Sequence, residues 1–135
     1  MTRNTLLLII TGILLTSLAA CQGPDIPVIT PAETQAQLGN DSLYLFLDVR
    51  TQQEFDAPSG HVPGSILIPV QELEARVGEL APYRGRTIIA ICRSGNRSGM
   101  ATSFLREQKF EARNMTGGMN RWNSEGLPVQ HTENK

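Results

Sequence analysis

The segment with the clearest chemical potential contains a cysteine followed closely by a glycine and two arginines: Cys92, Arg93, Ser94, Gly95, Asn96, Arg97 and Ser98. It follows an apolar run of strand length at residues 87–91 and precedes residues with helical spacing. Free N–H groups at the amino end of a helix favour an anion, and Arg93 and Arg97 add positive charge. The pattern therefore predicts that Cys92 has a lowered pKa and is the catalytic nucleophile.

The same segment has the composition of an anion-binding loop. Successive loop amides can form a concave nest around a negative ligand, so we expect residues 93–98 to bind an anionic substrate. Four of them are expected to act mainly through backbone amides and loop shape: Ser94, Gly95, Asn96 and Ser98. Gly95 is expected to adopt a positive φ or to allow close approach of the ligand. For the two arginines, the alternative interpretation is ordinary solvated surface charge.

The overall composition is that of one modest globular domain. Of the 135 residues, 40% are hydrophobic and 19% are charged, which is close to globular averages. The formal net charge of −1 gives no excess of positive charge that would suggest nucleic acid as a partner. Two cysteines cannot build a disulfide scaffold, and two histidines without ligand spacing do not support a metal site. We therefore expect neither a metal nor another cofactor.

Residues 1–20 have the features of a signal peptide. Arg3 and the amino terminus supply positive charge, and residues 6–18 form a nearly unbroken apolar run. The run ends in Leu18-Ala19-Ala20-Cys21, which resembles the lipobox of bacterial lipoproteins. This resemblance implies a fatty-acylated Cys21 that anchors the protein to a bacterial envelope membrane, facing the periplasm or the exterior. The alternative is an uncleaved membrane anchor, although the run is shorter than the roughly 20 residues of a typical span.

A lipid on Cys21 would leave Cys92 as the lone thiol of an exported protein, and such a thiol is potentially reactive. Residues 21–30 contain glycine and prolines without periodicity, so we expect them to form a tether between the membrane and the domain. The domain is expected at residues 31–130, followed by a frayed tail at residues 131–135.

Strand and helix patterns alternate along this domain. Thr30 with Glu33, and Thr51 with Glu54, form capping boxes that predict the starts of two helices. Apolar runs and helical spacing predict the other elements: strands at 43–49, 65–68, 87–91 and 111–115, and helices at 70–80, beyond 98 and at 119–122. In the helix beyond the cysteine loop, we expect an apolar stripe that includes Met100. The alternation predicts an α/β fold with a mainly parallel sheet.

Five motifs are spaced along the domain: Asp48-Val49-Arg50, Glu54-Phe55, Gly60-His61-Val62-Pro63-Gly64-Ser65, the Cys92 to Ser98 loop, and Gly117-Gly118-Met119 with Trp122. Their order resembles that of the rhodanese sulfurtransferases over residues 31–130. The resemblance implies a five-stranded, mainly parallel sheet with helices on both faces and the cysteine loop at the carboxyl end of a strand. The resemblance implies that His61 is chiefly structural. We expect Asp48 and Arg50 to brace the sheet end and the cysteine loop through hydrogen bonds, with contact between Arg50 and the substrate as the alternative.

The resemblance implies sulfane-sulfur transfer in two half-reactions. The Cys92 thiolate takes the outer sulfur of a small anionic donor such as thiosulfate, and cyanide or a thiol, including a protein thiol, then removes it. Arg93 directly after the cysteine is similar to the thiosulfate-using branch of the family. Loop amides are expected to stabilise the charge that develops in both steps.

Two other functions fit parts of the pattern. Cysteine-dependent phosphatases and arsenate reductases also present amides and an arginine to an oxyanion, but their arginine stands at the position that Ser98 occupies here. The second alternative is a persulfide carrier or binding module that delivers sulfur to a protein partner. The sequence does not distinguish a small acceptor from a large one.

Overall fold

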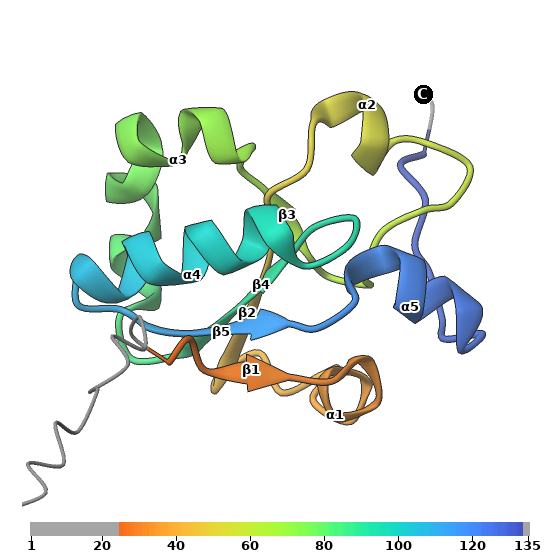
Figure 1. Ribbon diagram of the computed structural model, residues 1–135, viewed down its shortest axis with the longest axis horizontal. Coiled ribbons are helices and arrows are strands. Elements are labelled where there is room, and N and C mark those ends of the chain that lie inside the picture. The colour runs from red at the N-terminus through yellow and green to blue at the C-terminus, as the bar shows by residue number, and fades with distance from the viewer. Residues whose placement is uncertain (1–24, 134–135) are drawn as a thin grey trace, which may run out of the picture.

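Five parallel strands form the central sheet of the computed structural model, which describes residues 25–133 (Figure 1). Across the sheet their order is β1 (Val28–Ile29), β5 (Glu111–Met115), β4 (Thr87–Ile91), β2 (Tyr44–Asp48) and β3 (Ile66–Leu67). Every neighbouring pair is parallel. The expected five-stranded parallel α/β sheet is confirmed.

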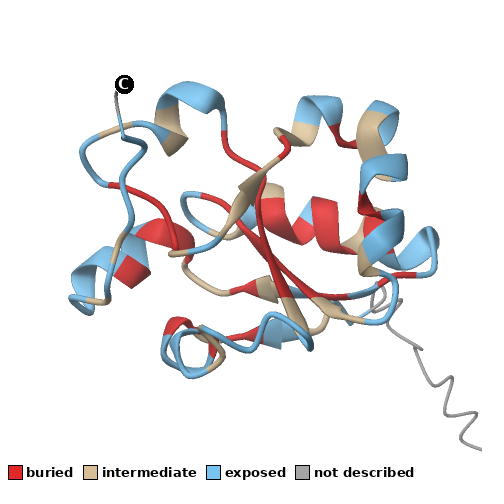
Figure 2. Ribbon diagram, turned by 180° about the vertical axis from the view of Figure 1, so that it is seen from behind, coloured by how far each residue is buried: buried red, intermediate tan, exposed pale blue. Residues whose placement is uncertain are grey.

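The helices cover both faces of this sheet. Their bounds are α1 (Pro31–Gln35), α2 (Gln52–Phe55), α3 (Val70–Arg76), the 3-10 helix η1 (Val77–Tyr83), α4 (Asn96–Glu107) and α5 (Gly118–Ser124). The core residues of α3, η1 and α4 pack on one face, and those of α5 pack on the other. Buried residues accordingly concentrate in the central strands and on the sheet-facing sides of the helices (Figure 2).

The apolar runs form central strands because their side chains alternate between two separate cores. Leu45 and Leu47 of β2 belong to the cluster beneath α3 and α4, whereas Phe46 belongs to the cluster beneath α5. Ile88 and Ile89 of β4 divide in the same way. A strand buried on both faces needs apolar residues at every position, which explains why these runs do not alternate with polar residues.

Both capping boxes are present at the predicted helix starts. The Thr30 hydroxyl accepts a hydrogen bond from the Glu33 amide, and the Glu33 carboxylate accepts one in return from the Thr30 amide. Thr51 and Glu54 make the same reciprocal pair at the start of α2. These local hydrogen bonds satisfy amides that have no partner within the helix.

The beginning of the domain differs from the expectation. Residues 28 and 29 were expected to belong to the tether, but they form β1, which pairs with β5 at the edge of the sheet. In the expected tail, the Thr132 hydroxyl donates to the Asp56 carboxylate. An edge strand this short has no periodic pattern of its own, so hydrophobic periodicity did not predict it.

The position of Met100 also differs from the expectation. Met100 is 65% exposed, whereas Ala101 and Leu105 of the same helix are buried. Successive helix positions are about 100° apart, and the buried face of α4 is centred on Ala101 and Leu105 together with Ser98 and Thr102. The predicted stripe was therefore partly wrong because two polar residues take the place of Met100 on the sheet side.

Cys21 and the expected signal peptide lie outside the described residues. Within residues 25–133, no helix is long and apolar enough to cross a bilayer.

Candidate active site

Cys92 follows β4 directly, at the edge of the sheet where the parallel strands end. The residue is 1% exposed, but its sulfur lies among polar groups. The Gly95 backbone N–H donates to Sγ at 3.0 Å, and the Ser98 hydroxyl approaches Sγ at 3.2 Å. The sulfur therefore lies in a cradle of neutral hydrogen-bond donors at the start of α4.

This cradle favours the thiolate. Burial raises the pKa of the thiol, but hydrogen bonds from the Ser98 hydroxyl and amide and from the amides of Gly95 and Ser94 lower it by more. The pKa of Cys92 is therefore below the ordinary value for cysteine. This direction agrees with the expectation of an activated thiol, and a thiolate is the form that attacks sulfur.

The loop keeps its shape through contacts at both of its ends. Gly95 has a φ of +105° and precedes α4, as expected for a residue that turns the chain back toward the sulfur. The first turn of α5 holds the other end, where Met119 N–H donates to the Cys92 carbonyl at 2.8 Å and Asn120 N–H donates to the Arg93 carbonyl at 2.9 Å. A Cβ at Gly118 would lie 2.4 Å from the Cys92 carbonyl oxygen, so only glycine allows this approach.

One site residue was not predicted from the sequence. Asn114 of β5 accepts a hydrogen bond from the Ser98 hydroxyl at 2.6 Å and donates one from its Nδ2 to the Gly95 carbonyl at 3.0 Å. It thus connects two residues of the cradle that both contact the sulfur. The only sequence signal was a polar residue near the carboxyl end of the strand beside β4.

Arg97 is engaged by a residue that lies far away in the sequence. Its two terminal guanidinium nitrogens donate to the Glu54 carboxylate at 2.8 and 2.7 Å, which joins α4 to α2. This pair lowers the pKa of Glu54 to about 2 and raises that of Arg97. Arg97 was predicted to bind substrate, and in the structure its guanidinium is paired with this carboxylate. From the sequence, Glu54 was identified as a capping residue and as part of the Glu54-Phe55 motif, but not as the partner of Arg97.

The remaining loop residues are solvent-accessible. Ser94 and Asn96 are exposed, as is Arg93. Arg93 lines a cavity of about 300 Å³ together with Arg50 and with Asn120 and Asn123 of α5. This cavity lies next to the cysteine loop, and its lining is mixed in charge, because Glu54 also lines it and Arg50 is paired with Asp48.

Asp48 and Arg50 form a buried ion pair at the end of β2. The closest approach is 2.7 Å, and the two side chains are 0% and 3% exposed. Arg50 also donates to the Gly60 carbonyl at 3.0 Å. His61 is buried, stacks on Phe55 with ring centroids 3.7 Å apart, and places Nδ1 3.2 Å from the Phe55 carbonyl. These contacts join the end of β2 to Gly60 and hold His61 against Phe55, and none of them is made to the cysteine loop.

Among residues 25–133, no group of three or more His, Cys, Asp and Glu side chains is arranged to hold a metal ion. The same part of the chain holds Cys92 as a free thiol.

A family model and several known proteins match this chain. A family model described as the rhodanese-like domain matches residues 30–125. The chain is 35% identical over 98 residues to the putative sulfur carrier protein YrkF of Bacillus subtilis, covering 72% of this chain and 51% of that protein. It is 30% identical over 74 residues to the thiosulfate sulfurtransferase PspE of Escherichia coli, covering 55% of this chain and 69% of that protein.

A solved structure extends the similarity to the fold. A rhodanese-related protein from Thermoplasma volcanium superposes with a TM-score of 0.69 at 32% identity, covering 77% of this chain and 97% of that one. The chain spans about half the length of YrkF and nearly all of the Thermoplasma chain.

Proposed function

This chain belongs to the rhodanese-like family, and from that premise we propose that it transfers sulfane sulfur from thiosulfate through a persulfide on Cys92. The observation that carries the proposal is the cradle of neutral donors, from Gly95 and Ser98, around a sulfur with a lowered pKa. A thiolate held in this way is a nucleophile that needs no separate general base. The similarity to PspE supports thiosulfate as the donor.

The first half-reaction loads the site. The Cys92 thiolate attacks the outer sulfur of thiosulfate, the sulfur–sulfur bond of the donor breaks, and sulfite leaves with the bonding electron pair. The product is a persulfide whose outer sulfur carries the negative charge. Loop amides stabilise this charge, and the exposed Arg93 beside the loop attracts the anionic donor.

The second half-reaction empties the site. Cyanide attacks the outer sulfur and leaves as thiocyanate, or a thiolate acceptor takes the same sulfur and becomes a persulfide itself. The electron pair of the broken bond returns to Cys92, so the enzyme ends as the thiolate and needs no external oxidant or reductant. Two separate half-reactions predict ping-pong kinetics.

The phosphatase alternative is disfavoured by the arrangement of charge. Ser98 occupies the place of the phosphate-binding arginine, and its hydroxyl contacts the sulfur. Arg97, one residue earlier, is bonded to Glu54. The site therefore lacks a free arginine directed at a tetrahedral oxyanion above Cys92.

A persulfide carrier that delivers sulfur to a protein thiol is the second candidate. The similarity to YrkF, a putative sulfur carrier protein, favours it. Both functions share the loading step and differ in the acceptor. Comparing cyanide, small thiols and reduced proteins as acceptors of a preloaded persulfide separates them: an enzyme turns over rapidly with small acceptors, and a carrier does so only with its partner.

Intact mass spectrometry tests the loading step. Incubation with thiosulfate alone should add the mass of one sulfur atom, and cyanide should remove it. Cys92→Ser should give no adduct and should reduce thiosulfate-to-cyanide transfer by at least about a thousandfold, because the nucleophile is lost. Hydrolysis of an aryl phosphate without any sulfur adduct would contradict the proposal.

We also propose that the protein is anchored to a bacterial envelope membrane by a lipid on Cys21. The support is the lipobox-like sequence at residues 18–21 after an apolar run. Metabolic labelling with a fatty acid should mark the full-length protein and fail after Cys21→Ala, with Cys92→Ala as the matched cysteine control. Equal labelling of both variants would contradict the anchor.

A further inference from the structure

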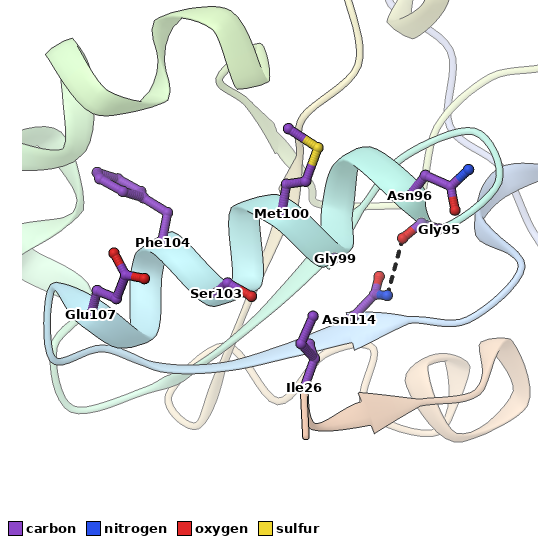
Figure 3. Close-up of a pocket in the computed structure, with 9 residues that line it drawn as sticks. All are labelled: Ile26, Gly95, Asn96, Gly99, Met100, Ser103, Phe104, Glu107 and Asn114. Atoms are coloured by element: carbon purple, nitrogen blue, oxygen red, sulfur yellow. Dashed lines mark hydrogen bonds between the residues drawn. The ribbon is translucent and has the colours of Figure 1, made fainter. Parts of the chain in front are cut away.

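Asn114 is held in one orientation by its neighbours. The Gly95 carbonyl, 3.0 Å from Nδ2, carries no proton, so the amide must present its NH2 group to that oxygen. The amide oxygen then faces the Ser98 hydroxyl at 2.6 Å. The close-up in Figure 3 shows Asn114 reaching from β5 toward Gly95 at the amino end of α4.

The Ser98 hydroxyl therefore faces two groups that compete for one proton. Asn114 Oδ1 lies at 2.6 Å and Cys92 Sγ at 3.2 Å, and a hydroxyl has a single hydrogen to donate. Ser98 is fully buried, so bulk water does not reach its hydroxyl, whereas Asn114 is partly exposed and lines the neighbouring pocket. When Cys92 is a neutral thiol, S–H can donate to Ser98 Oγ while the hydroxyl donates to Asn114.

Ionisation changes this arrangement. The Cys92 proton goes to solvent, and the thiolate then needs donors, so the Ser98 hydrogen turns from Asn114 Oδ1 to Sγ. Asn114 Oδ1 is left facing Ser98 Oγ with no hydrogen between two acceptors. Ionisation of Cys92 thus costs the hydrogen bond between Ser98 and Asn114.

We propose that Asn114 is a positioning residue that limits the ionisation of Cys92 by competing for the hydroxyl proton of Ser98. The inference rests on the proposed role of Cys92 as the nucleophile and concerns how that role is adjusted. In the persulfide, the negative charge moves to the outer sulfur, and the hydroxyl can return to Asn114. The network therefore favours the loaded site over the free thiolate.

The test is the pH dependence of Cys92 ionisation, followed by thiolate absorbance and by iodoacetamide alkylation. Asn114→Ala should release the hydroxyl and raise the thiolate fraction about threefold at a pH below the midpoint, the size of one neutral hydrogen bond. In a Ser98→Ala background, the same change should leave the fraction unaltered. Asn40→Ala, in the turn before β2, is the matched control and should have no effect.

Two results would overturn the proposal. One is a fall in thiolate fraction in Asn114→Ala, which would mean that Asn114 assists ionisation. The other is an equal rise with and without Ser98, because a merely structural role does not depend on that hydroxyl.

A second variant keeps the test decisive if Asn114→Ala does not fold. Asn114→Asp retains an acceptor and adds charge, so it should lower the thiolate fraction, and at least half of the decrease should vanish in Ser98→Ala. A decrease that is reduced by less than half in Ser98→Ala would overturn the proposal. Neither readout uses thiosulfate, so failure of the proposed sulfur transfer would appear separately, as the absence of a sulfur adduct on the unmodified protein.

Discussion

The carboxyl ends of β2 and β4 are neighbours at the same edge of the sheet, with Asp48 paired in register with Ile91. At the end of β2, two full charges lie buried against each other as Asp48 and Arg50. At the end of β4, the anion-forming group is Cys92, and its contacts are neutral N–H and O–H donors. The end of β2 thus pairs two full charges with each other, whereas the end of β4 surrounds its anion-forming group with neutral donors.

This difference separates structural from chemical roles. A buried carboxylate with a bidentate guanidinium partner is neutralised and inert, so the end of β2 acts as a brace. A thiolate held by dipoles is stabilised but retains its lone pair for attack. A direct bond to a buried arginine would stabilise it further and would lower its nucleophilicity, which falls with pKa.

Of the three arginines near the site, two are paired with carboxylates and one is exposed. Arg50 is committed to Asp48, and Arg97 to Glu54. The sequence suggested that Arg97 would act on Cys92 or its substrate, but packing directs its guanidinium to a carboxylate on α2. Arg93 is the exposed cation of the loop and faces the cavity beside it.

The largest effect should come from breaking the brace. Asp48→Asn leaves the Arg50 charge buried without its partner and should lower the free energy of unfolding by about 3–5 kcal/mol, as measured by urea denaturation. Glu74→Gln, at an exposed position, is the control and should change it by less than about 0.5 kcal/mol. A loss as small as that of the control would remove the distinction between the two strand ends.

An intermediate effect should come from the neutral cradle. Ser98→Ala removes one donor to the sulfur and should raise the pKa of Cys92, decreasing the thiolate fraction near neutral pH about tenfold. The alkylation profile of the variant should therefore move to higher pH. Ser103→Ala, on the same helix but without contact to the sulfur, is the matched control.

The alkylation profile of Cys92 against pH also tests whether neutral donors or the ion pair of Arg97 and Glu54 stabilise the thiolate. The double variant Glu54→Gln with Arg97→Gln removes the ion pair without changing the net charge. It should shift the profile less than Ser98→Ala does. A larger shift in the double variant would show that the thiolate depends on the arginine rather than on the cradle.

The smallest effect should come from the partly exposed pair of Arg97 and Glu54, whose side chains are 29% and 28% exposed. Glu54→Gln should lower the free energy of unfolding by about 1 kcal/mol at neutral pH, a value reduced by solvent screening. Folding lowers the pKa of Glu54 from 4.5 to about 2, so its contribution is complete above about 4.5. It disappears as the pH falls toward 2.

Denaturation of the wild type and Glu54→Gln at a series of pH values checks this prediction. The difference between the two proteins should be constant above pH 4.5 and shrink below it. A difference that grows as the pH falls would contradict the assignment of the shift to the Arg97 pair.

Much of the fold follows from local sequence. The strands at residues 87–91 and 111–115 have their predicted bounds, and both capping boxes form. The edge strand β1 was missed because it has two residues, and only pairing with β5 defines it. Met100 was misplaced because its helix turns Ser98 and Thr102 toward the sheet, which apolar spacing does not indicate.

The residues of the candidate site also fall into two groups: those that the sequence indicated and those that only the fold brings together. The nucleophile, the glycine turn and the helix start that follow one another at residues 92–98 are visible in the sequence, because each arises from its immediate neighbours. Glu54 meets Arg97 across 43 positions, and Asn114 meets Ser98 across 16. Such partners depend on which elements the parallel sheet brings together.

The sequence by itself thus determined where a reactive thiol could form, since backbone conformation and helix dipoles are set within a few residues. Tertiary structure decided which group each charge and hydroxyl would face. Those choices depend on burial and on packing between distant strands and helices, where an unpaired polar group is costly and a partner must be found in space.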